Sequence, residues 1–145
     1  MSTSDDNWSW QCDQVIQNDP VVGRRLLDEM LERLEALGWS RRDIFGVHLA
    51  VDEALINAVF HGNALDEAKH VRFCCWLSSE KVRVEIIDEG PGFDPDALPD
   101  PTDAVHLDRP GGRGVLLMRS FMSHVEFHDH GNHVVLEKTR EEKRG

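Results

Sequence analysis

Cysteine, basic residues and long apolar runs are all scarce in this 145-residue sequence, and each scarcity argues against a class of protein. The three cysteines, two of them adjacent at Cys74 and Cys75, form neither a disulfide framework nor a spaced metal-binding motif. We interpret them as small apolar strand residues in a reducing cytoplasm. No apolar run approaches the roughly 18 residues expected of a membrane span. Residues 1–7 are too polar and acidic for a signal peptide.

Basic residues number 16 against 27 acidic ones, which gives a formal net charge of −11. An acidic surface repels phosphate backbones and anionic lipids, so nucleic acids and membranes are disfavoured as main partners. Hydrophobic residues still make up 40% of the chain, enough for a core. This length corresponds to one ordinary domain. We therefore expect a single domain over residues 1–145, with a core over about 8–138.

The spacing of apolar residues predicts the order of helices and strands. Ser40 is a suitable N-cap for the second helix, and Gly38 and Gly62 are suitable ends for the first and second helices. The expected elements are a strand over about 8–15, helices over about 22–37 and 40–61, strands over about 71–77 and 82–86, a helix over about 115–122, and strands over about 125–128 and 133–138. This order predicts an α+β fold, a two-layer sandwich in which helices pack on one mixed, mostly antiparallel sheet.

A polar stripe on the second helix forms the first candidate site. Glu53, Asn57 and His61 are spaced four residues apart, beside the stripe that faces the core. Magnesium in nucleotide sites takes one or two protein oxygens, which suits the Asn57 carboxamide. Glu53, one turn earlier, is placed to accept a proton from an attacking hydroxyl. The alternative is a polar helix edge that only faces water.

A strand that ends in an acidic, glycine-containing turn forms the second candidate site. Asp88 follows the apolar pair Ile86 and Ile87, and Gly90 and Gly92 come directly afterwards. A carboxylate at this place can accept a hydrogen bond from an exocyclic amine, such as that of adenine. Glycines there let the backbone approach the ring without an intervening Cβ. The alternative is an ordinary Asp-containing turn after a strand.

A glycine run with flanking arginines forms the third candidate site. Gly112 and Gly114 lie just before the third expected helix. Gly112 stands between Arg109 and Arg113, and Gly114 directly follows Arg113. Free backbone N–H groups and the positive end of a helix dipole make such a place suited to phosphate. It is not a Walker A loop, because no Gly-Lys-Ser/Thr sequence follows. The alternative is a flexible linker that precedes a helix.

Together and in this order, the three patches resemble the N box, G1 box and G2 box of the histidine-kinase-like ATPase (GHKL) superfamily. The resemblance covers about residues 8–136. Within the superfamily, two stretches resemble those of the anti-sigma-factor serine kinases. They are Asp52-Glu53-Ala54 leading to Asn57 and His61-Gly62-Asn63, and the run Pro110–Met118.

The resemblance implies ATP and Mg²⁺ as ligands and a role for each matched residue. Glu53 corresponds to the general base that acts on a serine hydroxyl, and Asn57 to the residue that holds Mg²⁺. Asp88 corresponds to the residue that recognises the adenine amine, while Gly90 and Gly92 shape its pocket.

The G2 box and the partners are also implied by the resemblance. Gly112 and Gly114 would wrap the phosphates beneath a lid, with Arg109 and Arg113 as further phosphate contacts. The family phosphorylates a serine of a small antagonist protein and sequesters a sigma factor, usually as a cytoplasmic homodimer. Residues 93–109 give no clear partner motif. The alternative function is a catalytically inactive, ATP-dependent binding module that regulates a protein partner.

Overall fold

A computed structural model describes residues 8–91, 112–129 and 131–140, apart from the side chains of residues 112 and 113. In this part of the chain the order of elements is the expected one. The elements are β1 (Trp10–Gln17), α1 (Pro20–Ala36), α2 (Arg41–Ile56), η2 (Asn57–Gly62), β2 (His70–Leu77), β3 (Lys81–Ile87), α3 (Gly112–Phe121), β4 (His124–His128) and β5 (His133–Thr139). The first strand therefore lies two residues later than the expected 8–15.

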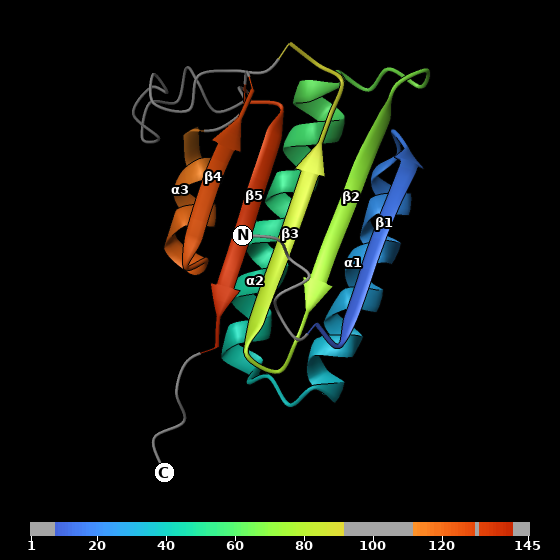
Figure 1. The fold of residues 1–145 in the computed structure, drawn as a ribbon. Coiled ribbons are helices and arrows are strands. Elements are labelled where there is room, and N and C mark those ends of the chain that lie inside the picture. The colour runs from blue at the N-terminus through green and yellow to red at the C-terminus, as the bar shows by residue number, and fades with distance from the viewer. Residues whose placement is uncertain (1–7, 92–111, 130, 141–145) are drawn as a thin grey trace.

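The strands form one sheet in the order β1-β2-β3-β5-β4, and all four pairings are antiparallel. Figure 1 shows α1, α2 and α3 on the same side of this sheet. The predicted α+β fold with two layers is confirmed. The chain crosses between β3 and β5 by way of α3 and β4, so β3 lies at the centre of the sheet.

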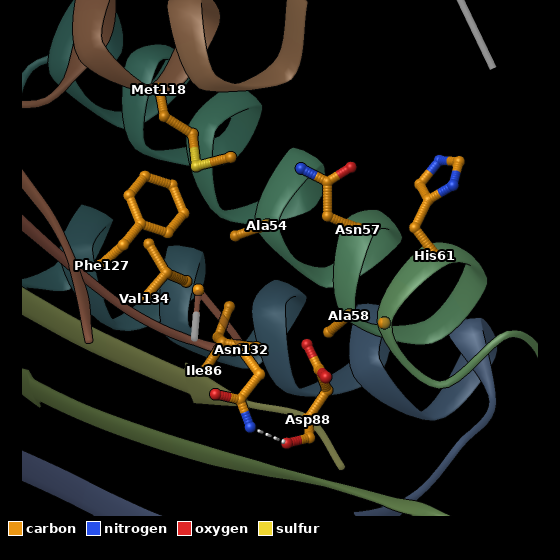
Figure 2. Close-up of a pocket in the computed structure, with 12 residues that line it drawn as sticks. Ala54, Asn57, Ala58, His61, Ile86, Asp88, Met118, Phe127, Asn132 and Val134 are labelled. Carbon is orange, nitrogen blue, oxygen red and sulfur yellow. Dashed lines mark hydrogen bonds between the residues drawn. The ribbon is translucent and has the colours of Figure 1, made fainter. Parts of the chain in front are cut away.

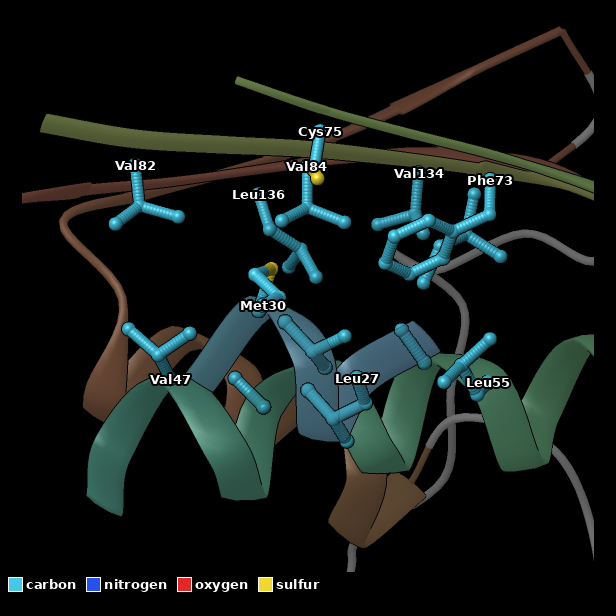
Figure 3. Close-up of a cluster of buried hydrophobic side chains, with 14 of the residues drawn as sticks. Leu27, Met30, Val47, Leu55, Phe73, Cys75, Val82, Val84, Val134 and Leu136 are labelled. Carbon is cyan, nitrogen blue, oxygen red and sulfur yellow. The ribbon is translucent and has the colours of Figure 1, made fainter. Parts of the chain in front are cut away.

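The core lies between the sheet and the helices, as Figure 3 shows. Leu27, Met30 and Leu34 of α1 are buried at the predicted helical spacing. Alternate residues of the central strands face them from the sheet, where Val84 lies opposite Leu136 in the ladder. Helices α1 and α2 bury their apolar faces against the same face of the sheet. This packing fixes the position of α2 and of the polar residues at its end.

Side-chain caps explain where the two long helices begin. The Asp19 side chain accepts a hydrogen bond from the Val21 backbone N–H at 2.9 Å, and Pro20 occupies the first helical position. This cap places the start of α1 two residues before the expected residue 22. The Ser40 hydroxyl accepts a hydrogen bond from the Asp43 N–H at 3.1 Å, which confirms Ser40 as the N-cap of α2.

The second helix ends at Gly62 as predicted, but its last six residues form a π-helix, η2. A π-helical turn is wider than an α-helical turn and is frequently found at functional sites. The sequence did not predict this change. Here it begins at Asn57, a residue of the first candidate site.

The continuous helix from Arg41 to Gly62 is, among the described residues, the one helix that by length and composition alone is apolar enough to cross a membrane. Half of the most apolar window is buried inside the molecule. The helix is apolar because it packs on the sheet, and in the fold it is a core helix.

Candidate functional site

A pocket of about 440 Å³, measured with its open mouth, lies where the end of α2 meets β3, β5 and α3. Its walls are mainly apolar, and four polar side chains converge on it. The apolar residues are Ala54, Ala58, Ile86, Met118, Phe127 and Val134, and the polar ones are Asn57, His61, Asp88 and Asn132. Figure 2 shows these side chains gathered from elements that are far apart in the sequence.

Asp88 follows β3, and two hydrogen bonds between its backbone and Asn132 hold it against the turn between β4 and β5. Its N–H donates to the Asn132 carbonyl oxygen at 2.9 Å, and the Asn132 Nδ2 donates to the Asp88 carbonyl oxygen at 3.0 Å. The carboxylate is directed into the pocket (Figure 2). Its Oδ1 accepts a hydrogen bond from the Gly90 N–H at 2.7 Å. Within the described part of the chain, Oδ2 accepts none, so it is available to a ligand.

Burial raises the pKa of Asp88, and the Gly90 N–H and the positive charge of Lys69 only partly oppose this rise. Partial removal from water disfavours the charged form of a carboxyl group. A hydrogen-bond donor from a ligand would therefore stabilise this carboxylate more than it would stabilise one on the open surface.

Gly62 and Gly90 let the end of η2 touch the turn after Asp88. A Cβ on Gly62 would lie 2.6 Å from the Asp88 Oδ1, and a Cβ on Gly90 would overlap the Gly62 carbonyl oxygen. Neither contact leaves room for a side chain. Gly90 was expected to let the backbone approach a ligand ring. Its immediate role in the structure is to let the turn approach the helix, and it does not line the pocket.

The third patch reaches the first at Gly114 of α3. A Cβ on Gly114 would lie 2.8 Å from the Glu53 Oε2 and 3.1 Å from the Asn57 Nδ2. The fold thus brings Glu53, Asn57 and Gly114 together, and Asn57 also lines the pocket that contains Asp88. The three sequence patches therefore come together in the fold, around Asn57.

Glu53 is half-buried, and burial raises the pKa of its carboxyl group, with a further contribution from the neighbouring Asp52. The two carboxylates differ in their contacts. Asp52 forms an ion pair with Arg24 at 3.3 Å, whereas Glu53 has no ion pair or hydrogen bond within the described residues. A half-buried carboxylate with a raised pKa is a suitable proton acceptor.

Asn57 has a buried amide nitrogen, Nδ2, with no hydrogen-bond partner among the described residues. Buried polar atoms in proteins nearly always have a partner, so this atom marks a place where a ligand acceptor is expected. Figure 2 shows the amide nitrogen on the side of Met118 and the oxygen pointing away from it. The oxygen is therefore available to a cation.

Asn63 positions the Asp88 turn, and the sequence analysis gave it no role. It is fully buried, with its Nδ2 donating to the Asn18 Oδ1 at 3.1 Å and to the His70 carbonyl oxygen at 2.9 Å. Its Oδ1 accepts a hydrogen bond from the Glu89 N–H at 2.7 Å. One side chain thus joins the end of η2, the end of β1, the start of β2 and the residue after Asp88.

Several predicted site residues remain predictions. Gly92 and Arg109 lie outside the described residues, as does the side chain of Arg113. Gly112 is the first residue of α3. Asn132, in contrast, was missed as a pocket residue, and only its place in a polar turn could have suggested it.

Residues 17–138 match the family model described as the histidine kinase-like ATPase domain. The chain belongs to this family. The match begins at Gln17, the last residue of β1, and covers every later element up to Lys138, the next-to-last residue of β5. It also contains every residue of the candidate site, so the sequence-based resemblance to this superfamily is confirmed.

Curated relatives of this ATPase domain bear the names that the resemblance predicted. Serine/threonine-protein kinase BtrW of Bordetella bronchiseptica is 34% identical over 68% of this chain and 72% of its own length. Serine-protein kinase RsbW of Halalkalibacterium halodurans is 30% identical over 72% of this chain and 66% of its own length. Anti-sigma F factor of Clostridium perfringens is 25% identical over 66% of this chain and 72% of its own length.

A solved structure supports the fold of the ATPase domain. It contains the RsbU and RsbW domains of a Mycobacterium tuberculosis protein and superposes with a TM-score of 0.60 at 18% identity. The match covers 91% of this chain and 32% of that longer chain. At this identity the likeness concerns the fold alone.

Proposed function

We propose that this chain is an ATP-dependent protein serine kinase that acts as an anti-sigma factor. It would phosphorylate a serine of an antagonist protein and sequester a sigma factor. The observation that carries the proposal is the meeting of Glu53, Asn57 and Gly114 beside the pocket of Asp88. Relatives named serine kinases and anti-sigma factors support the choice of reaction and of partners.

The pocket suits the adenine ring of ATP. Ile86, Met118 and Phe127 supply apolar surface for a flat ring, and Asp88 supplies an acceptor at its edge. The free Oδ2 of Asp88 would accept a hydrogen bond from the exocyclic amine. Guanine carries a carbonyl oxygen at the corresponding position of its ring, so a carboxylate there favours adenine.

The donor set near Asn57 fits a magnesium ion. The Asn57 carboxamide oxygen points away from its buried nitrogen, and the Glu53 carboxylate lies one helical turn earlier. Mg²⁺ in nucleotide sites binds one or two protein oxygens and takes its other ligands from phosphates and water. Asn57 would hold the ion, which when bound neutralises negative charge on the phosphate oxygens.

Glu53 would accept the proton of the attacking serine. The serine oxygen then bonds to the γ-phosphorus as the bond to the β–γ bridging oxygen breaks, which leaves ADP and phosphoserine. A carboxylate with a raised pKa is a stronger base than an ordinary glutamate. Glu53 is half-buried and forms no ion pair with the residues that the structure describes, which leaves it available for this step.

The start of α3 would bind the phosphates. Gly114 already lies against Glu53 and Asn57, so the first backbone N–H groups of this helix are close to the proposed magnesium position. Gly92, Gly112, Arg109 and Arg113 remain proposed nucleotide contacts on the strength of the family motif.

The partners, assembly and location follow from the relatives rather than from the geometry. We infer a sigma factor and a serine-containing antagonist as partners, a homodimer as the assembly and the cytoplasm as the location. These inferences rest on the family resemblance and on relatives named anti-sigma F factor.

Calorimetry of ATP binding tests the site. Wild type should bind ATP more tightly with Mg²⁺ than without it, and Asp88→Asn should weaken binding about 10- to 100-fold, the loss of one charged hydrogen bond. Asp28→Asn makes the same chemical change at an exposed position of α1 and should leave the affinity unchanged. Absence of ATP binding in the wild type would exclude the proposal.

Phosphoryl transfer from γ-labelled ATP to antagonist proteins of the same organism tests the reaction. Glu53→Gln should lower the transfer rate by about 10²- to 10⁴-fold, the usual contribution of a general base. Asp52→Asn is the matched control, because Asp52 pairs with Arg24, and should stay within a few-fold of the wild type. Magnesium-dependent ATP binding without transfer to any antagonist would support the inactive binding module instead.

A further inference from the structure

Two of the three cysteines lie opposite each other in the sheet. Cys12 of β1 and Cys75 of β2 are direct partners in the antiparallel ladder, and their sulfur atoms are 3.3 Å apart. We propose that Cys12 and Cys75 form a dithiol that peroxide converts reversibly into a cross-strand disulfide. This site of oxidative modification is independent of the nucleotide pocket, which neither residue lines.

The backbone is already suited to this bond. Directly opposite residues of an antiparallel ladder have Cα atoms about 4.5–5.5 Å apart. That interval lies within the roughly 4.4–6.8 Å found for disulfide-bonded cysteines. Both side chains lie on the helix-facing side of the sheet. Cys75 is part of the core (Figure 3), and Cys12 packs against it. Closure therefore needs a change in side-chain torsion and no movement of a strand.

The two thiols are unequal, which assigns each a role. The hydrogen bond between the two sulfur atoms lowers the pKa of Cys12 and, together with burial, raises the pKa of Cys75. Cys12 is partly exposed, whereas Cys75 is fully buried. Reactive cysteines are those with thiolate character and access to solvent. Cys12 is thus the residue that meets peroxide, and Cys75 is the residue that resolves the product.

The chemistry balances with hydrogen peroxide as the oxidant. The Cys12 thiolate attacks one peroxide oxygen, the O–O bond breaks, and the departing hydroxide takes up the proton that Cys12 released, which gives water. The Cys75 sulfur then attacks the sulfur of the Cys12 sulfenic acid and displaces a second water. Two thiols lose two electrons in all, and one peroxide gains them.

Cys74 is a built-in control. Its side chain lies on the opposite face of the sheet from that of Cys75, because neighbouring strand residues alternate. Its sulfur donates a hydrogen bond to the Asp13 carboxylate at 3.3 Å. Burial and this acceptor raise the pKa of Cys74 to about 12, so it stays a thiol at neutral pH. Cys74 is therefore expected neither to react first nor to reach Cys12.

The bond would fasten an edge strand. In the described part of the chain β1 pairs with β2 alone, as Figure 1 shows. A link between residues 12 and 75 encloses both α1 and α2, so it restricts the unfolded chain over a long loop. The oxidised protein should melt at a higher temperature than the reduced protein, and a reducing thiol should reverse the change.

The test uses the full chain with Cys74→Ser, treated with hydrogen peroxide and then analysed by intact mass and by peptide mapping without reduction. We expect a monomer that has lost two hydrogen atoms, a Cys12–Cys75 cross-link and a higher melting temperature, all reversed by dithiothreitol. Failure to form this cross-link, or a product cross-linked only between molecules, would overturn the proposal.

Two further variants assign the roles. Cys12→Ser changes a partly exposed residue and should show neither the cross-link nor the rise in melting temperature. Cys75→Ser should accumulate a sulfenic acid at Cys12 that dimedone traps. In the wild type, oxidation of Cys74 before Cys12 would contradict the assignment. That wild-type result decides the roles even where Cys75→Ser, a core change, fails to fold.

Discussion

Between Arg41 and Ile56, helix α2 is α-helical and buries Val47, Ala50 and Ala54 against the core. Between Asn57 and Gly62 the same helix is π-helical, and it presents Asn57 and His61 to a pocket. The first part is held by apolar contacts along its length. The second part is held by close backbone approach at Gly62 and by the hydrogen bonds of Asn63, the residue that follows it.

The difference between the two parts shows that the unfavourable polar features of the helix lie at its π-helical end, beside the candidate site. The Asn57 amide nitrogen, which is buried and has no hydrogen-bond partner among the described residues, and two carboxyl groups with raised pKa values all lie at or beside the π-helical end. Each feature is unfavourable in the isolated chain. A bound ligand would relieve them, so the rigid α-helical part serves to hold an end that is incomplete without one.

The largest effect is expected where the π-helical end touches the Asp88 turn. Gly90→Ala would place a methyl group on the Gly62 carbonyl oxygen, and backbone cannot move aside as a flexible side chain can. We expect a loss of about 2–4 kcal/mol in the free energy of unfolding and a loss of ATP binding. Denaturant unfolding and calorimetry measure the two.

Gly23→Ala is the matched change in the core region. A Cβ on Gly23 would lie 3.3 Å from the Leu55 Cδ2, the end of a flexible side chain. Because alanine also favours the helix, the free energy of unfolding should change by no more than about 1 kcal/mol and ATP affinity should stay the same. A Gly90→Ala protein as stable as the wild type would refute the close approach.

The next largest effect is expected at Asn63. Asn63→Ala leaves the Glu89 N–H and the His70 carbonyl group without their buried partner. The expected cost is about 2–3 kcal/mol in stability, together with weaker ATP binding because the residue after Asp88 is released. Asn18→Ala removes a neighbour in the same network that does not contact Glu89, so it should lower stability and spare ATP affinity. Equal loss of affinity in both variants would mean that Asn63 has no positioning role.

A feature of α2 could be predicted from the sequence where it depends on contacts between residues close together in the chain, and not where it depends on contacts between distant residues. The α-helical part could be predicted from local signals, because the Ser40 cap and the stripe of core residues involve only residues within a few helical turns of one another. The π-helical end could not, since its apolar residues fit the same spacing as those of the α-helical part. The positioning role of Asn63 could not be predicted either, because its partners Asn18 and Glu89 lie 45 and 26 positions away.

The smallest effect is expected from substitution of single carboxyl groups. The sign of the change in melting temperature should differ between the carboxyl groups of the site and a carboxyl group on the far face of the sheet. Glu53 and Asp88 have raised pKa values in the folded protein, mainly through burial. Their contribution to stability is therefore present below the unfolded pKa and is lost as the pH rises through the folded pKa. Because burial disfavours the charged form of both groups, Glu53→Gln and Asp88→Asn should each raise the melting temperature slightly at neutral pH.

Asp13, on the sheet face away from the helices, should behave in the opposite way. Hydrogen bonds from Arg72 and then from Cys74 lower the pKa of Asp13 to about 2. Its contribution is present above the unfolded pKa of roughly 4 and is lost as the pH falls towards 2. Asp13→Asn should therefore lower the melting temperature at neutral pH, though only slightly because the pair with Arg72 is exposed. Melting curves of the three variants from pH 3 to pH 8 measure the contrast. If Glu53→Gln and Asp88→Asn lowered the melting temperature as Asp13→Asn does, the two site carboxylates would be stabilising, and the π-helical end would not be the strained part of the molecule.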